Sequence, residues 1–422
     1  MRRVGIVGGG AAGLCAARHV LASGKMTPVV WESSTGVGGT WRYSPVVGRD
    51  AHGNPIHSSM YKNLRTNLPK EVMAFPDFPF PEDGDSFVHH TVVAKYLQDY
   101  AAHFDVSPCV KHEHLVEKVS PVRDAEGNTS WAITARDLNK NTSLTTICDA
   151  VFICNGHYSV PKLPKLPGIE RYGGRQVHSH DYREPTSFRG ASVLVLGGGA
   201  SGLDIAIELA TEAKEVILSH RLPKPVSSEL PSNMRQVAVA TAATEDGFLL
   251  SDGSSVKADV ILYCTGYEYT FPFLDAECEV RVDGNQVKPL YKHMINCDFP
   301  SMAFLGIPVQ ICPFPMFDFQ VRFFMQVLTG KLALPSAAEM KAEVSARWRS
   351  GCPRAWRLAT STTSILQWEY TRNMAALAGI HATNPVVEAL FTAVREVRNK
   401  TLMTYKKNRY RITGSDSFER VA

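Results

Sequence analysis

Closely spaced cysteine pairs are missing from this sequence. The nine cysteines are odd in number, and no two of them form a Cys-x-x-Cys motif. This argues against a disulfide framework, a zinc centre and a redox-active pair. Cys154 and Cys264 lie within apolar runs, where a free thiol ordinarily packs as a small hydrophobic side chain. We therefore expect no metal site and no cysteine chemistry.

Long apolar runs are also missing. No stretch reaches the roughly 18–20 apolar residues that span a bilayer, and the first apolar strand begins at Arg3, which leaves no room for a signal peptide. We expect a soluble protein without a membrane anchor, cytoplasmic as the sequence stands, or secreted if a leader has been removed. Glycosylation sequons at Asn128, Asn141 and Asn399 leave the compartment open.

Runs of one charge are the third absence. The net charge of +4 is spread along the chain, so no surface dedicated to nucleic acid is indicated. The 422 residues exceed the size at which one hydrophobic core stops growing. We expect two domains, with room for large cofactors, and small molecules as partners.

What the sequence does contain is one supersecondary pattern in two copies. In residues 3–32 an apolar run leads through a glycine-rich turn into a helical pattern and then into a second apolar run, and residues 191–221 repeat the same order. A strand, glycine turn, helix and strand in this order form the βαβ unit of a parallel sheet. The sequence therefore predicts an α/β fold.

Each copy carries the motif GxGxxG between its first strand and its helix. The first glycine turns the chain, the second lets the backbone approach a pyrophosphate, and the third packs the helix on the strand. The phosphates then lie at the helix N-terminus. The predicted dinucleotide contacts are Gly8, Gly10, Ala11, Ala12 and Gly13 in the first copy, and Gly197, Gly199, Ala200, Ser201 and Gly202 in the second.

One position distinguishes the two copies. Glu32 stands nineteen residues after Gly13, and Arg221 stands nineteen residues after Gly202. A carboxylate at this position accepts hydrogen bonds from ribose hydroxyls, whereas a guanidinium binds a 2′-phosphate. The first copy therefore suits FAD and the second suits NADPH, with Ser219 as a further contact. An ordinary surface arginine is the alternative for Arg221.

Further segments carry a resemblance to a known family. The run from Tyr172 to Tyr182 fits FxGxxxHxxx(F/Y) with Tyr at the first position, and it stands just before the second glycine turn. Residues 38–42 are similar to a second flavin contact, and residues 264–267 to a domain-crossing motif. With these motifs the chain resembles the flavin-containing monooxygenases over nearly its whole length. The sequence of residues 61–80 is similar to that of the insect branch of this family, which includes pyrrolizidine-alkaloid (senecionine-type) N-oxygenases.

The resemblance implies two Rossmann-like dinucleotide-binding domains. An FAD domain in two parts, residues 1–160 and 299–422, would enclose an inserted NADPH domain of residues 161–298. NADPH would reduce FAD, oxygen would form a flavin hydroperoxide, and a soft nucleophilic nitrogen or sulfur of a small molecule would take up one oxygen atom. A homo-oligomer is left open. The further implied cofactor contacts are Gly39, Thr40, Trp41, Thr66, Asn67, Asp204, Thr265, Gly266 and Gln320.

Asn67 is the catalytic residue that the resemblance implies. A neutral amide can donate a hydrogen bond to the hydroperoxide without supplying the proton that would release peroxide. An asparagine that caps a turn before Pro69 is the alternative. For His178 we favour a role in orienting the domain hinge over one as a general base. Asp318 and Gln320 are expected either near the flavin or in the core.

Three rival functions remain to be weighed. A disulfide reductase is excluded, because the redox cysteine pair is missing. A Baeyer–Villiger monooxygenase is disfavoured, because those relatives carry tryptophan near the position of Tyr182. An NADPH oxidase or an FAD-containing electron carrier stays as the alternative.

Overall fold

The first βαβ unit lies within a seven-stranded sheet. β1 (Arg2–Val7) pairs in parallel with β2 (Met26–Trp31), and α1 (Ala11–Ala22) joins them. The first seven residues of α1 are all buried and mostly small, which suits a helix enclosed between a sheet and further helices. The structure is a computed structural model that describes residues 1–222, 224–226, 229–284, 286–349 and 363–421.

Parallel pairing dominates this first sheet. Its strands are, in spatial order, β18 (Leu290–Tyr291), β19 (Ile295–Asn296), β20 (Met302–Phe304), β7 (Ala150–Ile153), β1, β2 and β3 (Val110–Lys111). The helices of the same lobe are α1, α2 (Lys70–Met73), α3 (His90–His103), α5 (Pro313–Leu328), α6 (Ala337–Arg349) and α8 (Thr363–Ala378). Residues of α1, α3, α5 and α8 share one hydrophobic core with the sheet.

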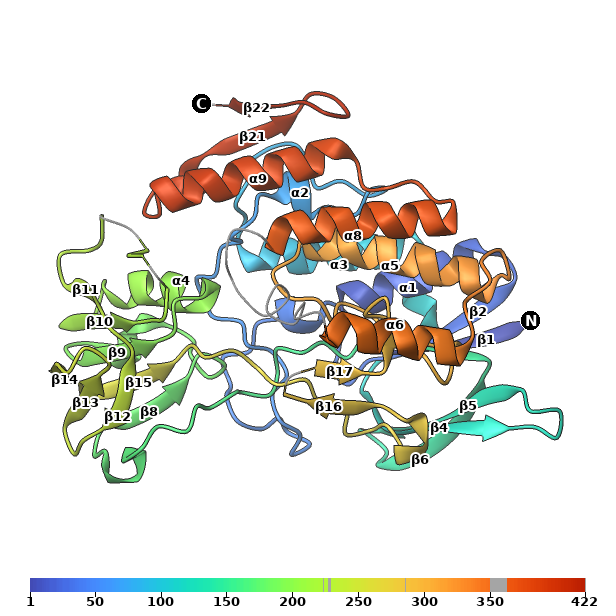
Figure 1. Ribbon diagram of the computed structural model, residues 1–422, viewed down its shortest axis with the longest axis horizontal. Helices are drawn as coiled ribbons and strands as arrows, with labels where there is room; N and C mark the ends of the chain where they lie inside the picture. Colours follow the sequence, from blue (N-terminus) through green and yellow to red (C-terminus); the bar gives the residue numbers. More distant parts are fainter. Residues whose placement is uncertain (223, 227–228, 285, 350–362, 422) are drawn as a thin grey trace.

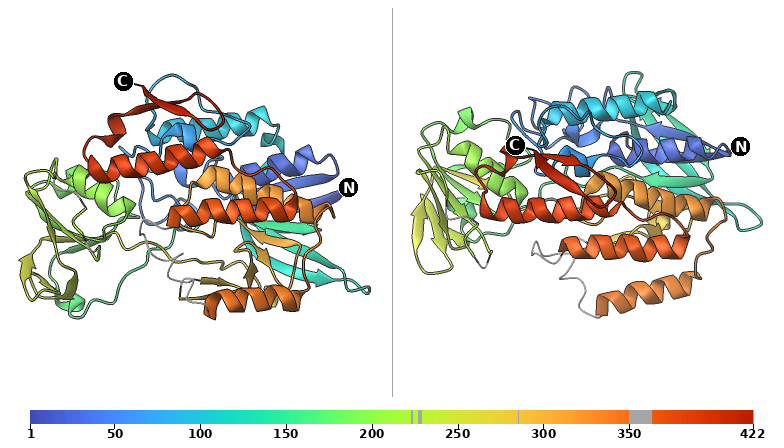
Figure 2. Two further views of the ribbon diagram at one scale, coloured as in Figure 1. Left: turned by 45° about the horizontal axis from the view of Figure 1, so that its top comes forward. Right: turned by 90° about the horizontal axis from the view of Figure 1, so that it is seen from above.

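The second βαβ unit forms a separate five-stranded sheet, with α4 (Ala200–Leu209) as its helix. All of its pairings are parallel. Its strands are, in spatial order, β11 (Met234–Val237), β10 (Glu215–Ser219), β9 (Ser192–Leu196), β15 (Val260–Tyr263) and β8 (Arg175–His178). Figures 1 and 2 show this lobe, green to yellow, lying beside the larger one. The α/β fold with two dinucleotide-binding frames is as predicted.

Smaller sheets complete the two lobes. One antiparallel sheet packs against the first lobe, another extends the second, and two hairpins follow later in the chain. Their strands are β4 (His114–Arg123), β5 (Thr129–Asp137) and β6 (Thr142–Cys148); β12 (Ala240–Ala243), β13 (Gly247–Leu250) and β14 (Ser255–Lys257); β16 (Arg281–Asp283) and β17 (Gln286–Lys288); and β21 (Arg409–Ile412) and β22 (Phe418–Val421).

The chain crosses between the lobes twice. It leaves the first sheet after β7 and re-enters it at β18, which begins at Leu290 and so precedes the expected return at residue 299. Leu274 already forms a β-bridge with Val119 of β4. The division into domains stays a proposal, and these pairings favour a second crossing soon after β15.

The helix α5 begins earlier in the chain than the sequence pattern predicts. The sequence pattern predicts a helix from Phe317, after a proline-rich run, whereas α5 begins at Pro313. Proline is tolerated in a first helical turn, where its missing N–H would have no intrahelical partner. Among the described residues, none of the helices is long and apolar enough to cross a membrane.

Candidate functional site

The first glycine turn exposes backbone N–H groups at a helix start. Gly8 has a φ of +103°, and a Cβ built there would lie 2.6 Å from the carbonyl oxygen of Cys154. A Cβ on Gly13 would lie 1.9 Å from the carbonyl oxygen of Gly8, so both positions require glycine. α1 has no side-chain cap and no acidic residue in its first turn, whereas α3 and α9 (Pro385–Lys400) are capped by His89 and Asn384. An uncapped helix start suits a pyrophosphate.

Glu32 stands at the edge of this turn, directly after β2, and is 6% exposed. Its carboxylate accepts hydrogen bonds from the backbone N–H of Gly9 at 2.8 Å, and from the N–H and hydroxyl of Ser34 at 2.8 and 2.6 Å. A carboxylate offers roughly four acceptor positions. The three donors fix its orientation and leave acceptor capacity for a ribose hydroxyl.

The second glycine turn repeats the first in detail. Gly197 has a φ of +125°, and a Cβ there would lie 2.4 Å from the carbonyl oxygen of Cys264. A Cβ on Gly202 would lie 1.8 Å from the oxygen of Gly197, while a Cβ on Gly199 would meet nothing within 4 Å. α4 also lacks a side-chain cap and acidic residues in its first turn, and its first two residues are exposed. The residues of both turns therefore fit a dinucleotide.

Arg221 and Ser219 lie in different surroundings after β10. Arg221 is exposed, and its guanidinium forms no hydrogen bond or ion pair with another described residue, so it can receive a phosphate. Ser219 is fully buried, donating its hydroxyl to the carbonyl of Ala238 at 2.9 Å and accepting from the N–H of Ala240 at 2.9 Å. The hydroxyl of Ser219 thus fixes the strand edge, and a cofactor contact there stays a prediction.

The predicted second flavin contact packs on the first glycine turn. It forms a short 3-10 helix, η1 (Gly39–Trp41). A Cβ on Gly39 would lie 3.0 Å from the Cα of Gly10, so the two backbones are in close approach. Thr40 offers its carbonyl to the hydroxyl of Ser58 at 2.8 Å, and the ring of Trp41 meets Phe314 of α5 edge-on at 6.4 Å. The structure therefore brings this segment beside the predicted FAD site.

Thr66 holds Asn67 at the surface. Thr66 is 2% exposed, its N–H donates to the carbonyl of Val88 at 2.9 Å, and its hydroxyl accepts from the N–H of Val88 at 3.1 Å. Asn67 is exposed, and its amide bonds to no other described residue. The amide is therefore available to a ligand, as the predicted catalytic role requires.

His178 belongs to the motif of residues 172–182. It lies where the chain crosses between the two lobes. His178 is 5% exposed, and its Nδ1 accepts from the N–H of His180 at 3.1 Å, so its Nε2 carries the proton and donates to the carbonyl of Gly266 at 3.1 Å. Thr265 donates its hydroxyl to the carbonyl of Lys162 at 2.5 Å. Burial lowers the pKa of His178 to about 4. A neutral histidine with both ring nitrogens occupied supports the hinge role.

Aromatic residues after the two crossing strands form a cluster that the sequence analysis did not predict. Tyr158 is 45% exposed, yet burial raises its pKa to about 12. His57 is also exposed, and its pKa is lowered, chiefly by desolvation. Tyr158 contacts His157 and Tyr267 at ring distances of 4.2 and 5.5 Å. The aromatic residues that follow Asn155-Gly156 and Thr265-Gly266 are the sequence feature from which this cluster could have been predicted.

Two predicted contacts are engaged within the protein. The carboxylate of Asp204 accepts from the Tyr61 hydroxyl, and from the Lys406 ammonium at 2.5 Å. The fully buried Gln320 accepts from the N–H of Gly306 at 3.0 Å and donates to the Tyr370 hydroxyl at 3.3 Å. Asp204 thus lies between the lobes and Gln320 in the core, and their contacts with a cofactor stay predictions.

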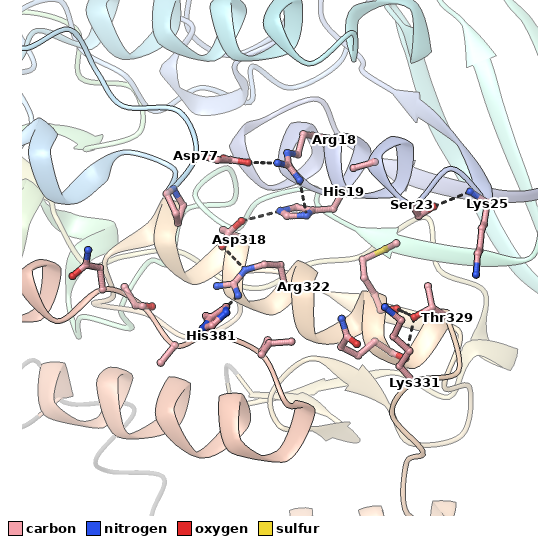
Figure 3. Close-up of a pocket in the computed structure, with 18 of the residues that line it drawn as sticks. Arg18, His19, Ser23, Lys25, Asp77, Asp318, Arg322, Thr329, Lys331 and His381 are labelled. Carbon is pink, nitrogen blue, oxygen red and sulfur yellow. Dashed lines mark hydrogen bonds and ion pairs between the residues drawn. The ribbon is translucent and has the colours of Figure 1, made fainter. Parts of the chain in front are cut away.

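A cavity of about 900 Å³ lies beside the C-terminal half of α1 (Figure 3). Its charged groups pair with one another: Arg18 contacts Asp77 and the Nδ1 of His19, and Arg322 contacts Asp318 at 2.7 Å. This cavity contains neither glycine turn, and both of its arginines pair with carboxylates of the cavity itself. We therefore do not place the cofactors there.

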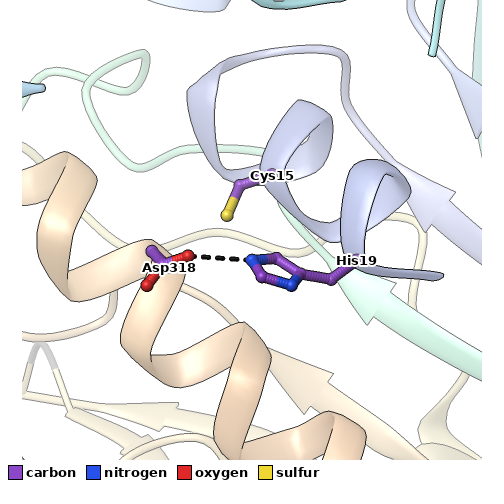
Figure 4. A group of neighbouring side chains, drawn as sticks. All are labelled: Cys15, His19 and Asp318. Atoms are coloured by element: carbon purple, nitrogen blue, oxygen red, sulfur yellow. Dashed lines mark hydrogen bonds and ion pairs between the residues drawn. The ribbon is translucent and has the colours of Figure 1, made fainter. Parts of the chain in front are cut away.

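Cys15, His19 and Asp318 lie close together at this cavity, with one ligand atom of each within 4.8 Å of the others (Figure 4). His19 accepts from Arg18 at Nδ1, so its Nε2–H donates to Asp318 at 2.8 Å. Burial raises the pKa of the Cys15 thiol well above its ordinary value. Two guanidinium groups beside a protonated thiol disfavour a metal cation, and we assign none.

Comparison with known proteins gives one family. The family described as flavin-binding monooxygenase-like matches residues 1–233 and 226–420. A flavin-containing monooxygenase of Arabidopsis thaliana, FMO GS-OX-like 2, is 40% identical over 377 residues, which are 84% of this chain and 80% of the relative.

Solved structures of related proteins cover nearly the whole chain. The S-allyl-L-cysteine S-oxygenase from Allium sativum has a TM-score of 0.87 at 35% identity, over 96% of this chain and 94% of that one. Tmm from a Pelagibacter strain has a TM-score of 0.87 at 27% identity, over 100% and 96% of the two chains. A cyclohexanone monooxygenase, at 15% identity and a TM-score of 0.63, shares the fold.

Proposed function

The chain belongs to the flavin-binding monooxygenase-like family, and from this membership we propose that it oxygenates a soft nitrogen or sulfur atom of a small molecule. The reaction class is flavin-dependent monooxygenation, with FAD and NADPH as cofactors and molecular oxygen as co-substrate. Two electrons from NADPH reduce one oxygen atom to water, while the other atom enters the substrate. The nature of the oxygenated atom is the part that we propose.

The observation that carries the proposal is the pair of matched glycine turns with different edge residues. Both turns place a first glycine against the carbonyl of a cysteine, Cys154 or Cys264, and both start an uncapped helix. Glu32 is buried and bonded at the first edge, whereas Arg221 is exposed at the second. Glu32 suits the ribose of FAD and Arg221 the 2′-phosphate of NADPH. FAD, when bound, supplies hydride acceptance and oxygen activation.

Asn67 is the residue that we propose to act at the reacting centre. Thr66 anchors the backbone beside it, and the amide of Asn67 remains exposed. An amide donates a hydrogen bond but transfers no proton at neutral pH. Asn67 therefore favours delivery of oxygen to the substrate over release of hydrogen peroxide.

A sulfide and a tertiary amine are the two substrate types with support. The relative from Allium sativum is named as an S-allyl-L-cysteine S-oxygenase, which favours sulfur. The sequence of residues 61–80 is similar to that of the insect branch, which favours the tertiary amine of an alkaloid. The aromatic rings of Tyr158 and Tyr267 suit a sulfide, because sulfur contacts aromatic rings favourably, and they offer apolar surface to the neutral form of a tertiary amine.

Product analysis tests the proposal. The FAD-loaded protein is supplied with NADPH and oxygen, and with S-allyl-L-cysteine, a senecionine-type alkaloid or no substrate. We expect one equivalent of S-oxide or N-oxide per NADPH with at least one of the two, and little peroxide. Peroxide equal to the NADPH consumed, with or without substrate, would instead identify an NADPH oxidase.

The variant Asn67→Ala tests the assignment within the site. We expect hydrogen peroxide to replace most of the oxygenated product, while NADPH still reduces the flavin without oxygen at a rate within about threefold of the wild type. Asn139→Ala, at an exposed turn, is the matched control and should leave both quantities unchanged. Unchanged coupling in Asn67→Ala would remove this residue from the reacting centre.

A further inference from the structure

Arg183 directly follows the motif of residues 172–182, and its guanidinium has an unusual set of hydrogen-bond partners. Its side chain is buried, with 9% of the residue exposed, and its contacts include no carboxylate oxygen within hydrogen-bonding distance. A guanidinium has five N–H donors, and here each finds a backbone carbonyl. Nη1 donates to the carbonyls of His180 at 2.7 Å and Tyr182 at 3.0 Å. These two bonds fix the guanidinium on its own segment.

The other three donors reach into the first lobe. Nε donates to the carbonyl of Ser44 at 2.6 Å, and Nη2 donates to the carbonyls of Val46 at 3.1 Å and Ser58 at 3.4 Å. Ser44 and Ser58 are the two ends of one loop, residues 44–58, which we call the clamped loop. A single side chain from the second lobe therefore ties both ends of a loop of the first.

The clamped loop has an ordered tip and an apolar, exposed flank. Asp50 organises the tip by accepting from the N–H groups of His52 and Asn54 at 2.9 and 2.8 Å. Val46 and Val47 are 52% and 46% exposed. The tip holds itself together, so its position relative to the rest of the molecule depends on the two ends.

The C-terminal end of the clamped loop lies beside the predicted flavin contact and the first crossing point. The hydroxyl of Ser58 donates to the carbonyl of Thr40 in the predicted flavin contact. The ring of His57 lies beside Gly156, where a built Cβ would be 3.4 Å from its Nε2. Residues 57 and 58, which Arg183 holds through Ser58, therefore contact both the flavin contact and the first crossing point.

We propose that Arg183 is a positioning residue that fixes the clamped loop as a wall of the substrate path, so that the loop selects which nucleophile enters. This inference rests on the proposed function, since it assigns the substrate side of the same site. Arginine is required because five carbonyls accept from its five N–H donors, whereas lysine carries three donors on one atom. The loop is attached to the second lobe, so substrate access also depends on the lobes keeping their relative position.

Substitution of Arg183 tests the attachment of the loop. In Arg183→Lys and Arg183→Met we expect trypsin to cleave after Arg49 at least fivefold faster than in the wild type, as measured by mass spectrometry of the FAD-loaded protein. Arg189→Gln removes an exposed arginine that pairs with Glu212, and it should leave this rate unchanged. Equal cleavage rates in all four proteins would overturn the proposal.

Steady-state kinetics test the role of the loop. In Arg183→Lys we expect the KM for the oxygenated substrate to rise at least tenfold with kcat within threefold, and flavin reduction by NADPH without oxygen to stay within twofold. A second variant replaces residues 49–54 by two glycines and keeps Arg183. It should change the ranking of substrates by KM, and unchanged ranking would overturn the proposal even if Arg183→Met failed to fold.

The two proposals fail in different ways. Loop cleavage and flavin reduction need no substrate, so both can be measured even if the wild type oxygenates nothing. Absence of any oxide in the wild type would contradict the proposed function. A functional wild type whose Arg183 variants keep the KM and the cleavage rate would contradict only the role of Arg183.

Discussion

Arg221 and Glu32 occupy equivalent positions, and we expect their different side chains to select different nucleotides. Arg221 is exposed, and its guanidinium forms no hydrogen bond or ion pair with another described residue. Charge-assisted hydrogen bonds contribute about 1.5–3 kcal/mol, so Arg221→Ala should weaken NADPH binding by roughly 10- to 100-fold. NADH, which lacks the 2′-phosphate, should bind nearly as before. Titration with both nucleotides checks this, and equal losses would remove the 2′-phosphate assignment.

His178 makes a pH-dependent contribution to stability. Its pKa is about 4 in the folded protein because of burial, against about 6.5 for an unfolded histidine. Below pH 6.5 the unfolded chain therefore binds a proton that the folded chain does not, so stability is lost as pH falls toward 4. Between pH 7 and pH 5 the loss is about 2 kcal/mol.

Urea denaturation at pH 7 and pH 5 measures this effect. The decrease in the free energy of unfolding should be smaller in His178→Asn than in the wild type. His112→Asn, at an exposed position, is the control and should keep the wild-type decrease. An identical decrease in all three proteins would show that His178 does not contribute.

At the scale of single elements, the two glycines of the second turn should behave in opposite ways. Gly197 has a φ of +125° and a backbone oxygen 2.4 Å from a built Cβ, whereas Gly199 has open space. Gly197→Ala should cost more than about 1–3 kcal/mol of stability, because backbone strain and a clash add. Gly199→Ala should stay within about 0.5 kcal/mol.

Gly199→Ala, the substitution that the fold should tolerate, is expected to weaken nucleotide binding. The methyl group of Gly199→Ala stands where the backbone must approach the pyrophosphate, so the variant should melt like the wild type yet bind both NADPH and NADH at least tenfold more weakly. Calorimetry without nucleotide, followed by titration, measures both quantities. Normal binding by Gly199→Ala would place the pyrophosphate elsewhere.

The elements that the sequence predicts well are those with a strict local pattern. Both glycine turns and their helices form where the pattern places them, because glycine at Gly13 and Gly202 is required by contacts within one βαβ unit. Contacts distant in sequence were not predictable. Asp204 bonds to Lys406, and the return of the chain to the first sheet at β18 depends on pairing with distant strands. No local pattern specifies such partners.

At the scale of the whole molecule, the C-terminal segment joins the two lobes beside Asn67. Lys406 donates to the carboxylate of Asp204 at 2.5 Å and to the carbonyl of Arg65 at 3.1 Å. Residues of α9 share a hydrophobic core with strands β9 and β10. The relative position of the lobes therefore depends on Lys406 and on α9.

Removal of the Lys406 ammonium tests this connection. Lys406→Met should lower the free energy of unfolding by about 1–2 kcal/mol, because a partly buried carboxylate loses a charged donor. In combination with Asp204→Asn the losses should be smaller than their sum, with a coupling of roughly 0.5–1.5 kcal/mol. Lys407→Met, one residue further and exposed, is the control in urea denaturation. Equal effects of Lys406→Met and Lys407→Met would contradict the connection.

The two crossings of the chain also set an order of assembly during synthesis. Every strand of the five-stranded sheet lies between Arg175 and Tyr263, whereas the first sheet pairs β7 with β20, which follows it. On a ribosome the second lobe can therefore complete its sheet while the first lobe still awaits β18, β19 and β20. Once folded, the inserted lobe holds the ends of β7 and of the returning chain near each other, which lowers the entropy cost of closing the first sheet. We therefore expect the inserted lobe to complete its fold first and to promote closure of the sheet whose strands lie on both sides of it in the sequence.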